Sequence, residues 1–239
     1  MTSSAIAALL QPFLDRELAP TQLNQISIYI DLLQRWNARI NLTAILNEEE
    51  IVTRHFGESL FMARHLFPNP SPEIASFNVI DIGSGAGFPA LPLKIWAPNL
   101  HLTLIESNHK KATFLREVAR TLALTNVNVI NDRAEAIAPT LDSQWSEASP
   151  HDPGRKESHP PLSAPKPKLA PADVVTFRAV EKFDRILPLA ATFISPTGRL
   201  AILIGPSQTD HLKQLNSLKW TTHPIPNSTS SLLAIGSRQ

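Results

Sequence analysis

Residues 77–88 read Phe-Asn-Val-Ile-Asp-Ile-Gly-Ser-Gly-Ala-Gly-Phe. The first half of this stretch is apolar and β-branched around one carboxylate, Asp81, which predicts a short strand buried on both faces of a sheet. Glycine then occupies every second position, at Gly83, Gly85 and Gly87. Because glycine lacks a Cβ, the backbone can turn sharply here and a ligand can lie directly against it. The stretch therefore predicts a strand that leads into a ligand-binding loop.

The spacing of the glycines separates two classes of cofactor. A dinucleotide site requires the pattern Gly-x-Gly-x-x-Gly, with the pyrophosphate at the N-terminus of the next helix. Here the position of the third glycine holds Phe88, and Pro89 follows it, so a dinucleotide-dependent oxidoreductase is the least favoured alternative. A smaller cofactor with a cationic or zwitterionic tail, such as S-adenosylmethionine, fits the pattern better. A turn that only connects a strand to a helix is the other interpretation.

Composition excludes several classes of protein. The chain has 239 residues, enough for one core domain with a small cap, and it contains no cysteine. Disulfides, thiolate catalysis and zinc–thiolate sites are thereby excluded, and we expect no bound metal. No apolar run approaches the roughly 18–20 residues of a membrane span, and the first residues lack signal-peptide features, so we expect a cytoplasmic protein without membrane contact. Because the formal net charge is only +1, any contact with nucleic acid must come from a local basic cluster.

Residues 1–72 predict a small cap made of helices. Apolar residues recur at helical spacing in residues 5–18, in a helix that follows Pro20 with Thr21 as its N-cap, and from Ile51 to Leu66. Three prolines close to residue 70 then mark the boundary with the main domain, which we expect over residues 73–239.

The helix expected over residues 51–66 carries charged residues with two interpretations. Its expected N-cap is Asn47. Arg54 and Glu58 lie one helical turn apart, so a surface ion pair between them is the simplest expectation. The alternative is that Arg54 and His55 face an anionic ligand.

Polar and basic residues outside the glycine loop are candidates for contact with a substrate. The Asn and Thr side chains of residues 37–43 either satisfy loop backbone groups or face a ligand, and Asn41 is the candidate to orient a substrate. The cations expected to contact phosphates are Arg35, Arg39, Lys110 and Lys111.

From residue 77 onward, strand-like and helix-like segments alternate, which predicts a parallel sheet with helices on both faces. We expect strands at residues 79–82, 101–105, 127–130, 173–179, 200–204, 220–223 and 231–235. We expect helices at residues 89–97, 110–124, 181–192 and 210–218, and a turn at residues 196–198. The proline-rich residues 142–172 cannot bury enough apolar surface to fold, and they predict a disordered surface insertion.

Glu106 and the polar turn after the third expected strand are candidates for cofactor binding. Glu106 ends the second expected strand, nearly 20 residues after the glycine loop, where a carboxylate can accept hydrogen bonds from both hydroxyls of a ribose. The alternative is that Glu106 caps the next helix. The polar turn after the third strand, residues 131–135, is expected to hold the adenine with backbone amides and an acid.

The chain resembles a known family over nearly its whole length. The matching segments are Arg35-Trp36-Asn37, Asn41-Leu42-Thr43, Arg54-His55, Glu58-Ser59-Leu60, Asp81 to Pro89, Glu106-Ser107, Lys111 to Leu115, Arg133-Ala134-Glu135 and Arg178-Ala179. With these segments the chain is similar to the RNA small-subunit methyltransferase G family, also called glucose-inhibited division protein B. The loop that ends in Phe88-Pro89, together with the Asn-Leu-Thr and Arg-His segments, is specific to this family.

The resemblance implies a class I S-adenosylmethionine-dependent methyltransferase fold. Such a fold is a Rossmann-like α/β domain with a seven-stranded sheet in which only the last strand is antiparallel, and here it carries the N-terminal helical cap. The family transfers a methyl group from S-adenosylmethionine to N7 of a guanine in 16S ribosomal RNA. The expected partner is therefore 16S rRNA or the small ribosomal subunit, and we expect a monomer.

The resemblance also implies site residues. It places cofactor contacts at Gly83, Phe88, Glu106, Ala134, Glu135 and Arg178, and the loop itself adds Asp81, Gly85 and Gly87. The residues expected to orient the substrate are Arg178, Arg54 and His55.

The chain departs from the family pattern at a few positions, and two other functions stay open. The family often has aspartate at Glu58 and serine at Phe177, and many members carry a lysine where this chain has Leu203-Ile204-Gly205. The insertion at 142–172 is also longer than usual. The alternatives are a methyltransferase for a small molecule or a protein, and a non-catalytic RNA-binding assembly factor.

Overall fold

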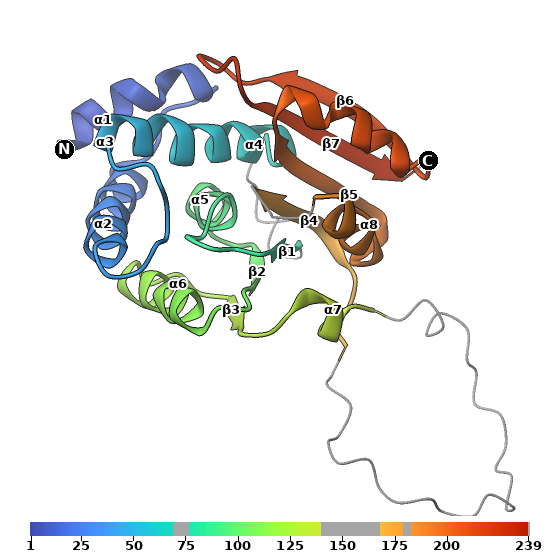
Figure 1. The fold of residues 1–239 in the computed structure, drawn as a ribbon. Coiled ribbons are helices and arrows are strands. Elements are labelled where there is room, and N and C mark those ends of the chain that lie inside the picture. The colour runs from blue at the N-terminus through green and yellow to red at the C-terminus, as the bar shows by residue number, and fades with distance from the viewer. Residues whose placement is uncertain (69–76, 140–167, 179–182, 239) are drawn as a thin grey trace, which may run out of the picture.

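The computed structural model describes residues 1–68, 77–139, 168–178 and 183–238, and its centre is a seven-stranded sheet of order β3-β2-β1-β4-β5-β7-β6 (Figure 1). The strands are β1 (Asn78–Ile82), β2 (His101–Ile105), β3 (Val127–Ile130), β4 (Ala172–Arg178), β5 (Ile194–Ile204), β6 (Leu218–Pro224) and β7 (Leu232–Arg238). Strand β7 is antiparallel to both its neighbours, and the other strands run in one direction. The expected class I sheet is confirmed.

Strand β1 lies at the point where the order of the sheet reverses. It pairs in parallel with β2 on one side and with β4 on the other, and Asp81 is opposite both Leu104 and Thr176. In open α/β sheets, ligands bind beyond the carboxyl ends of the strands at such a switch point. The glycine loop after β1 and Arg178 at the end of β4 therefore lie at the edge where a site is expected.

One face of the sheet is covered by the N-terminal helices together with the two helices that follow β1 and β2. These elements are α1 (Ser3–Leu10), η1 (Gln11–Phe13), α2 (Pro20–Asn37), α3 (Glu48–Glu50), η2 (Ile51–Gly57), α4 (Glu58–Leu66), α5 (Ala90–Trp96) and α6 (His109–Thr121). Buried side chains of α1, α2, η2, α4, α5 and α6 form one continuous apolar cluster with one face of the sheet. In the described residues, the N-terminal helices thus share one apolar core with the sheet.

The other face of the sheet is covered by α7 (Ala134–Ile137), α8 (Phe183–Thr192) and the 3-10 segment η5 (Pro206–Gln214). Alternate residues of each strand point to the two clusters: Val79 belongs to the first, and Ile80 and Ile82 belong to the second. This alternation explains why the strands read as continuous apolar runs in the sequence.

The starts of two cap helices differ in how well the sequence predicted them. Asn47 is the N-cap of α3, because its side chain accepts a hydrogen bond from the Glu50 amide at 3.0 Å, as expected. The prediction of Thr21 as an N-cap is wrong, because α2 begins at Pro20 with Ala19 before it. Proline suits the first helical position, since the amide that it lacks would have no partner inside the helix there.

Two expectations for the C-terminal half are wrong. Residues 196–198 do not form a turn between elements but lie inside β5, where the partner of β4 jumps from Ile194 to Arg199. The helix expected over residues 210–218 is a 3-10 segment that ends at Gln214, and Leu218 already pairs with Arg238 in the terminal hairpin. In both places pairing with a distant strand determined the structure, which local sequence does not reveal.

Several expectations fall outside the described residues. The boundary proposed at residues 72 and 73 lies there, as does most of the insertion expected over residues 142–172. At the described end of that insertion the Leu169 amide donates to the Ile137 carbonyl at 3.2 Å, and Ala172 begins β4. Within the described ranges, no helix has both the length and the apolar character that crossing a bilayer requires.

Candidate functional site

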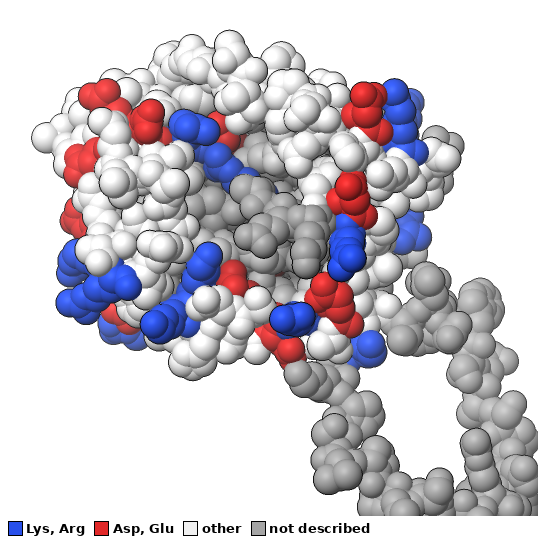
Figure 2. All heavy atoms as spheres, in the orientation of Figure 1, with Lys and Arg blue, Asp and Glu red and all other residues white. Residues whose placement is uncertain are grey.

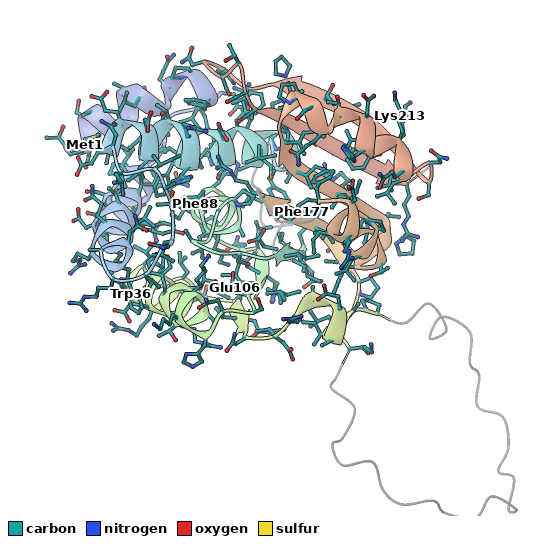
Figure 3. The ribbon with its side chains drawn as sticks, in the orientation of Figure 1. Met1, Trp36, Phe88, Glu106, Phe177 and Lys213 are labelled. Atoms are coloured by element: carbon teal, nitrogen blue, oxygen red, sulfur yellow. The ribbon has the colours of Figure 1, made fainter. Side chains whose placement is uncertain are left out.

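A cleft of about 330 Å³ lies at the carboxyl edge of β1, β2 and β4. It is lined by the loop residues Leu42, Thr43, Ala44, Gly83, Ser84, Gly85 and Ala86 and by His55, Phe88, Glu106, Lys111 and Arg178. The cap, the sheet and α6 therefore all contribute to it, and Figure 3 shows Phe88 and Glu106 in this central region. Its volume falls within the range of pockets that bind small molecules.

The glycine loop is held in a conformation that favours glycine. Gly83, Gly85 and Gly87 have φ angles of 69°, 53° and 88°. The amides of Gly83 and Ser84 both donate to the Ile105 carbonyl, at 2.9 and 3.1 Å, which fixes the loop to the end of β2. A Cβ placed on Gly85 would have no neighbour closer than 3.8 Å, so this part of the backbone is open to a ligand.

Glu106 holds the glycine loop from the neighbouring strand. One carboxylate oxygen accepts from the Gly85 amide at 2.8 Å, and the other accepts from the Asn108 amide at 2.7 Å. Each carboxylate oxygen has two lone pairs, so both oxygens can still accept a further hydrogen bond. Asn108 itself caps α6, so Glu106 also supports the start of that helix, as the alternative interpretation expected. The two interpretations of Glu106 are compatible.

Arg178 ties the end of β4 to the cap. Its guanidinium donates to the Glu58 carboxylate at 2.7 Å and to the Arg54 carbonyl at 2.8 Å. The Glu58 side chain is only 3% exposed, and burial raises the pKa of its carboxyl although Arg178 opposes that shift.

The expected surface pair between Arg54 and Glu58 is therefore wrong, because Glu58 is buried and pairs with Arg178. The backbone explains the difference. Residues 51–57 form a π-helix, in which hydrogen bonds join residues five apart, so residues four apart no longer lie directly above one another.

Phe88 is packed between two other rings. It stacks on Tyr29 at a centroid distance of 5.2 Å with an angle of 5° between the planes, and on His55 at 4.6 Å with an angle of 14°. The Tyr29 hydroxyl donates to the Ala86 carbonyl at 2.5 Å. Phe88 therefore fastens the glycine loop to the cap, a role that the sequence did not predict.

Replacing Tyr29 by phenylalanine is expected to lower the free energy of unfolding by about 1 kcal/mol. The ring stack on Phe88 would stay, but the buried Ala86 carbonyl would lose its donor. Urea unfolding measures the effect directly. An unchanged midpoint would contradict the hydrogen bond as a stabilising contact.

His55 is a neutral side chain at the wall of the cleft. Its Nε2 lies 2.8 Å from the Thr43 hydroxyl, and burial, Arg178 and Arg54 lower the pKa of its ring to about 3. Thr43 is in turn held by Asn37, whose side-chain oxygen accepts from the Thr43 amide at 3.0 Å. Asn37 thus satisfies loop backbone groups, whereas Thr43 and His55 line the cleft.

Asp81 is fully buried at the end of β1, and neither of its carboxylate oxygens has a hydrogen-bond partner among the described residues. The Ser84 hydroxyl donates to the backbone carbonyl of Asp81 at 3.1 Å. Burial, and to a lesser extent the carboxylate of Glu106, raise the pKa of Asp81 to about 8. At neutral pH this side chain is therefore largely protonated in the folded chain.

Replacing Asp81 by asparagine is expected to remove one pH-dependent contribution to stability. The pKa of Asp81 is higher in the folded than in the unfolded chain. The contribution of Asp81 to the free energy of unfolding therefore falls as the pH rises from about 4 to about 8. The slope is up to about 1.4 kcal/mol per pH unit for one proton. Between about pH 5 and about pH 7, the free energy of unfolding should rise more, or fall less, for Asp81→Asn than for the wild type, as measured by urea unfolding. The exposed Asp31, changed to asparagine, serves as the control, and an equal change in both variants would contradict the assignment.

The structure brings together some of the predicted site residues and leaves others apart from the cleft. Those that line it are Gly83, Gly85, Phe88, Glu106, Arg178 and His55, and those outside its lining are Asp81, Gly87, Arg54, Ala134 and Glu135. The turn before α7 nevertheless adjoins the cleft, because the Asn131 side chain donates to the Glu106 carbonyl at 2.8 Å. Among the other lining residues, the sequence makes Thr43 a candidate for facing a ligand and predicts that Lys111 contacts a phosphate. The sequence does not single out Leu42, Ala44, Ser84 or Ala86 as individual site residues.

Comparisons with known proteins agree with this geometry. Residues 22–148 match the family model described as rRNA small subunit methyltransferase G. A protein of Roseiflexus castenholzii named ribosomal RNA small subunit methyltransferase G is 40% identical over 184 residues, which are 74% of this chain and 65% of that protein. A protein of the same name from Bacillus subtilis is 32% identical over 195 residues, which are 82% of this chain and 69% of that protein. The chain thus spans about two thirds of the length of these curated relatives.

A solved structure shares the fold. The magnesium protoporphyrin IX methyltransferase of Synechocystis PCC 6803, solved with bound SAM, superposes with a TM-score of 0.58 at 14% sequence identity. The superposition covers 90% of this chain and 97% of that one. The sheet and its helices are therefore those of class I methyltransferases.

Proposed function

Because this chain belongs to the rRNA small subunit methyltransferase G family, we propose that it transfers a methyl group from S-adenosylmethionine to N7 of a guanine in 16S ribosomal RNA. Its partner in this proposal is 16S rRNA or the small ribosomal subunit. We further propose that the chain acts as a monomer in the cytoplasm, and that residues 1–72 form a cap on a methyltransferase domain of residues 73–239.

One observation carries the proposal: the Glu106 carboxylate accepts from the Gly85 amide at 2.8 Å within the cleft. The contact supports the proposal because a carboxylate with free lone pairs then lies beside a backbone without a side chain, and such a combination fits a nucleoside. In this proposal Glu106 would hold the ribose, and Gly83 and Gly85 would contact the cofactor through their backbone. When bound, S-adenosylmethionine supplies a methyl group on a sulfonium, which is a strong leaving group.

Methyl transfer to guanine N7 requires the protein mainly to align the guanine with the methyl donor. Guanine N7 has a free lone pair at neutral pH, so no side chain must remove a proton. A neutral His55 is consistent with this requirement, because it offers a ring for contact without taking part in proton transfer. Arg178, Arg54 and His55 are proposed to orient the guanine, and rate then comes from proximity and orientation.

The proposal is tested by mass-spectrometric mapping of methylated bases in 16S rRNA from cells with and without this protein. We expect one guanine to lose its N7 methyl group without the protein, and to regain it when purified protein, S-adenosylmethionine and the unmethylated small subunit are combined. Identical methylation maps would overturn the RNA substrate. Failure of the protein to bind S-adenosylmethionine in a titration would favour an assembly factor without catalysis.

A further inference from the structure

A second, smaller cavity of about 210 Å³ lies between the C-terminal end of α2 and the first turn of α6. We call it the α2–α6 groove, and it is lined by Trp36, Arg39, Ile40, His109, Lys110 and Thr113. The two helices lie next to each other in Figure 1, and Figure 2 shows blue lysine and arginine side chains gathered over this part of the surface. The groove is separate from the residues placed at the cofactor so far.

The groove combines an aromatic wall with cations. Trp36 is half-buried, and its indole is braced by the Phe114 ring at a centroid distance of 5.6 Å. Figure 3 shows Trp36 close to α6 at the lower end of α2. A ring held in this way loses little conformational freedom when a second planar group packs against it.

Cations line the groove on both of its sides. Arg39 and Lys110 are both exposed, and neither forms a salt bridge with any residue that the structure describes. None of the described lining residues is acidic, and the first turn of α6 carries no acid. The exposed Arg35, one residue before Trp36, lies near the Glu117 carboxylate of α6, which offsets part of its charge. The charge of this surface therefore favours an anion.

The groove also adjoins the cofactor cleft. Lys110 lines the groove, and the next residue, Lys111, lines the cleft. A chain of nucleotides that delivers one base to the cleft can therefore place a neighbouring nucleotide in the groove.

We propose that the α2–α6 groove binds a nucleotide that flanks the target guanine in single-stranded RNA. This inference rests on the proposed function. The base packs against Trp36 and Ile40, and Arg39 and Lys110 contact its phosphates. Proteins bind unpaired RNA with this combination of an aromatic platform and cations. A peptide would need an acidic and a planar side chain at the right spacing to match the groove, whereas every nucleotide carries both a phosphate and a planar base.

The first test uses the variants Arg39→Ala and Lys110→Ala and their combination. Each is expected to weaken binding of 16S rRNA and to raise the KM for RNA while leaving the affinity for S-adenosylmethionine unchanged. The slope of log affinity against log salt should fall by about 0.7 for each lost contact with a single-strand phosphate. Lys219→Ala is the matched control, because Lys219 is an exposed lysine on β6, at the opposite edge of the sheet. Equal effects in the control, or an unchanged slope in the double variant, would overturn the proposal.

The second test uses a short oligouridylate as the probe and measures its contact with Trp36, the aromatic wall of the groove. Binding is expected to quench tryptophan fluorescence in the wild type and to quench it much less in Trp36→Phe, which keeps an aromatic ring beside Phe114. Equal quenching in both proteins would overturn the role of Trp36. If the wild type methylates 16S rRNA but all variants match it, the groove proposal alone fails. If the wild type neither binds nor methylates RNA, the proposed function fails as well.

Discussion

Replacing Glu106 by alanine is expected to weaken the binding of S-adenosylmethionine by about 100-fold or more. In the proposed function the Glu106 carboxylate accepts two ribose hydroxyls, and hydrogen bonds to a charged group contribute about 1.5–3 kcal/mol each. Losing two of them corresponds to about 3 kcal/mol or more, and every 1.4 kcal/mol is about tenfold in affinity. The Gly85 amide would also lose its acceptor, so the loop would be held less firmly. Isothermal titration with S-adenosylmethionine measures the change.

Two further variants make this result specific. Glu106→Gln keeps the shape and one acceptor oxygen, so its affinity should lie between those of the wild type and the alanine variant. Glu49→Ala removes an exposed carboxylate of α3 and should leave the affinity unchanged. Wild-type affinity in Glu106→Ala would contradict ribose binding by this residue. A folded Glu106→Ala protein is verified by circular dichroism before the titration.

The glycine loop and Glu106 could be brought together from the sequence alone. Each was predicted at the end of a strand, and adjacent parallel strands end at the same edge of a sheet. The structure confirms this placement through the register of Ile82 opposite Ile105 and through the Gly85 contact. Local pattern and a general rule of sheet geometry were sufficient here.

The partners of the cap could not be predicted in this way. Tyr29 lies within the helix expected after Pro20, and nothing in the local sequence shows that its ring stacks on Phe88. Arg178 and Glu58 are separated by 120 residues, and their pairing depends on how η2 and α4 dock against the end of β4. Such contacts are set by tertiary packing, which propensity and spacing do not encode.

The π-helix illustrates the same limit within a single element. A sequence of residues at helical spacing predicts that Arg54 and Glu58 share a face, and this holds only for an α-helix. Gly57 ends the π-helical segment, and a Cβ on it would lie 2.7 Å from the Phe13 ring. Close packing against η1 is therefore possible only with glycine at this position. Gly57 thus allows η1 to contact the end of η2, and the spacing of Arg54 and Glu58 in the sequence does not reveal this contact.

Replacing Gly87 by alanine is expected to lower the free energy of unfolding by about 3 kcal/mol or more. Two penalties add, because the φ angle of 88° is unfavourable for alanine and the new methyl group has no space. Its Cβ would lie 2.5 Å from Leu91 Cδ1 and would also clash with the Tyr29 hydroxyl. A left-handed conformation costs about 1–2 kcal/mol, and overpacking a core costs about 1–3 kcal/mol more. Urea unfolding measures the loss, which is a large part of a typical total of about 5–15 kcal/mol.

Gly85→Ala is the matched variant, since Gly85 has the same kind of φ angle but open space around it. It should lose only about 1–2 kcal/mol, from the backbone conformation alone. Its methyl group would instead project into the space proposed for the cofactor, so the affinity for S-adenosylmethionine should fall sharply. Equal losses of stability in the two variants would show that packing around Gly87 relaxes without cost. Unchanged cofactor affinity in Gly85→Ala would show that the ligand does not lie against this part of the loop.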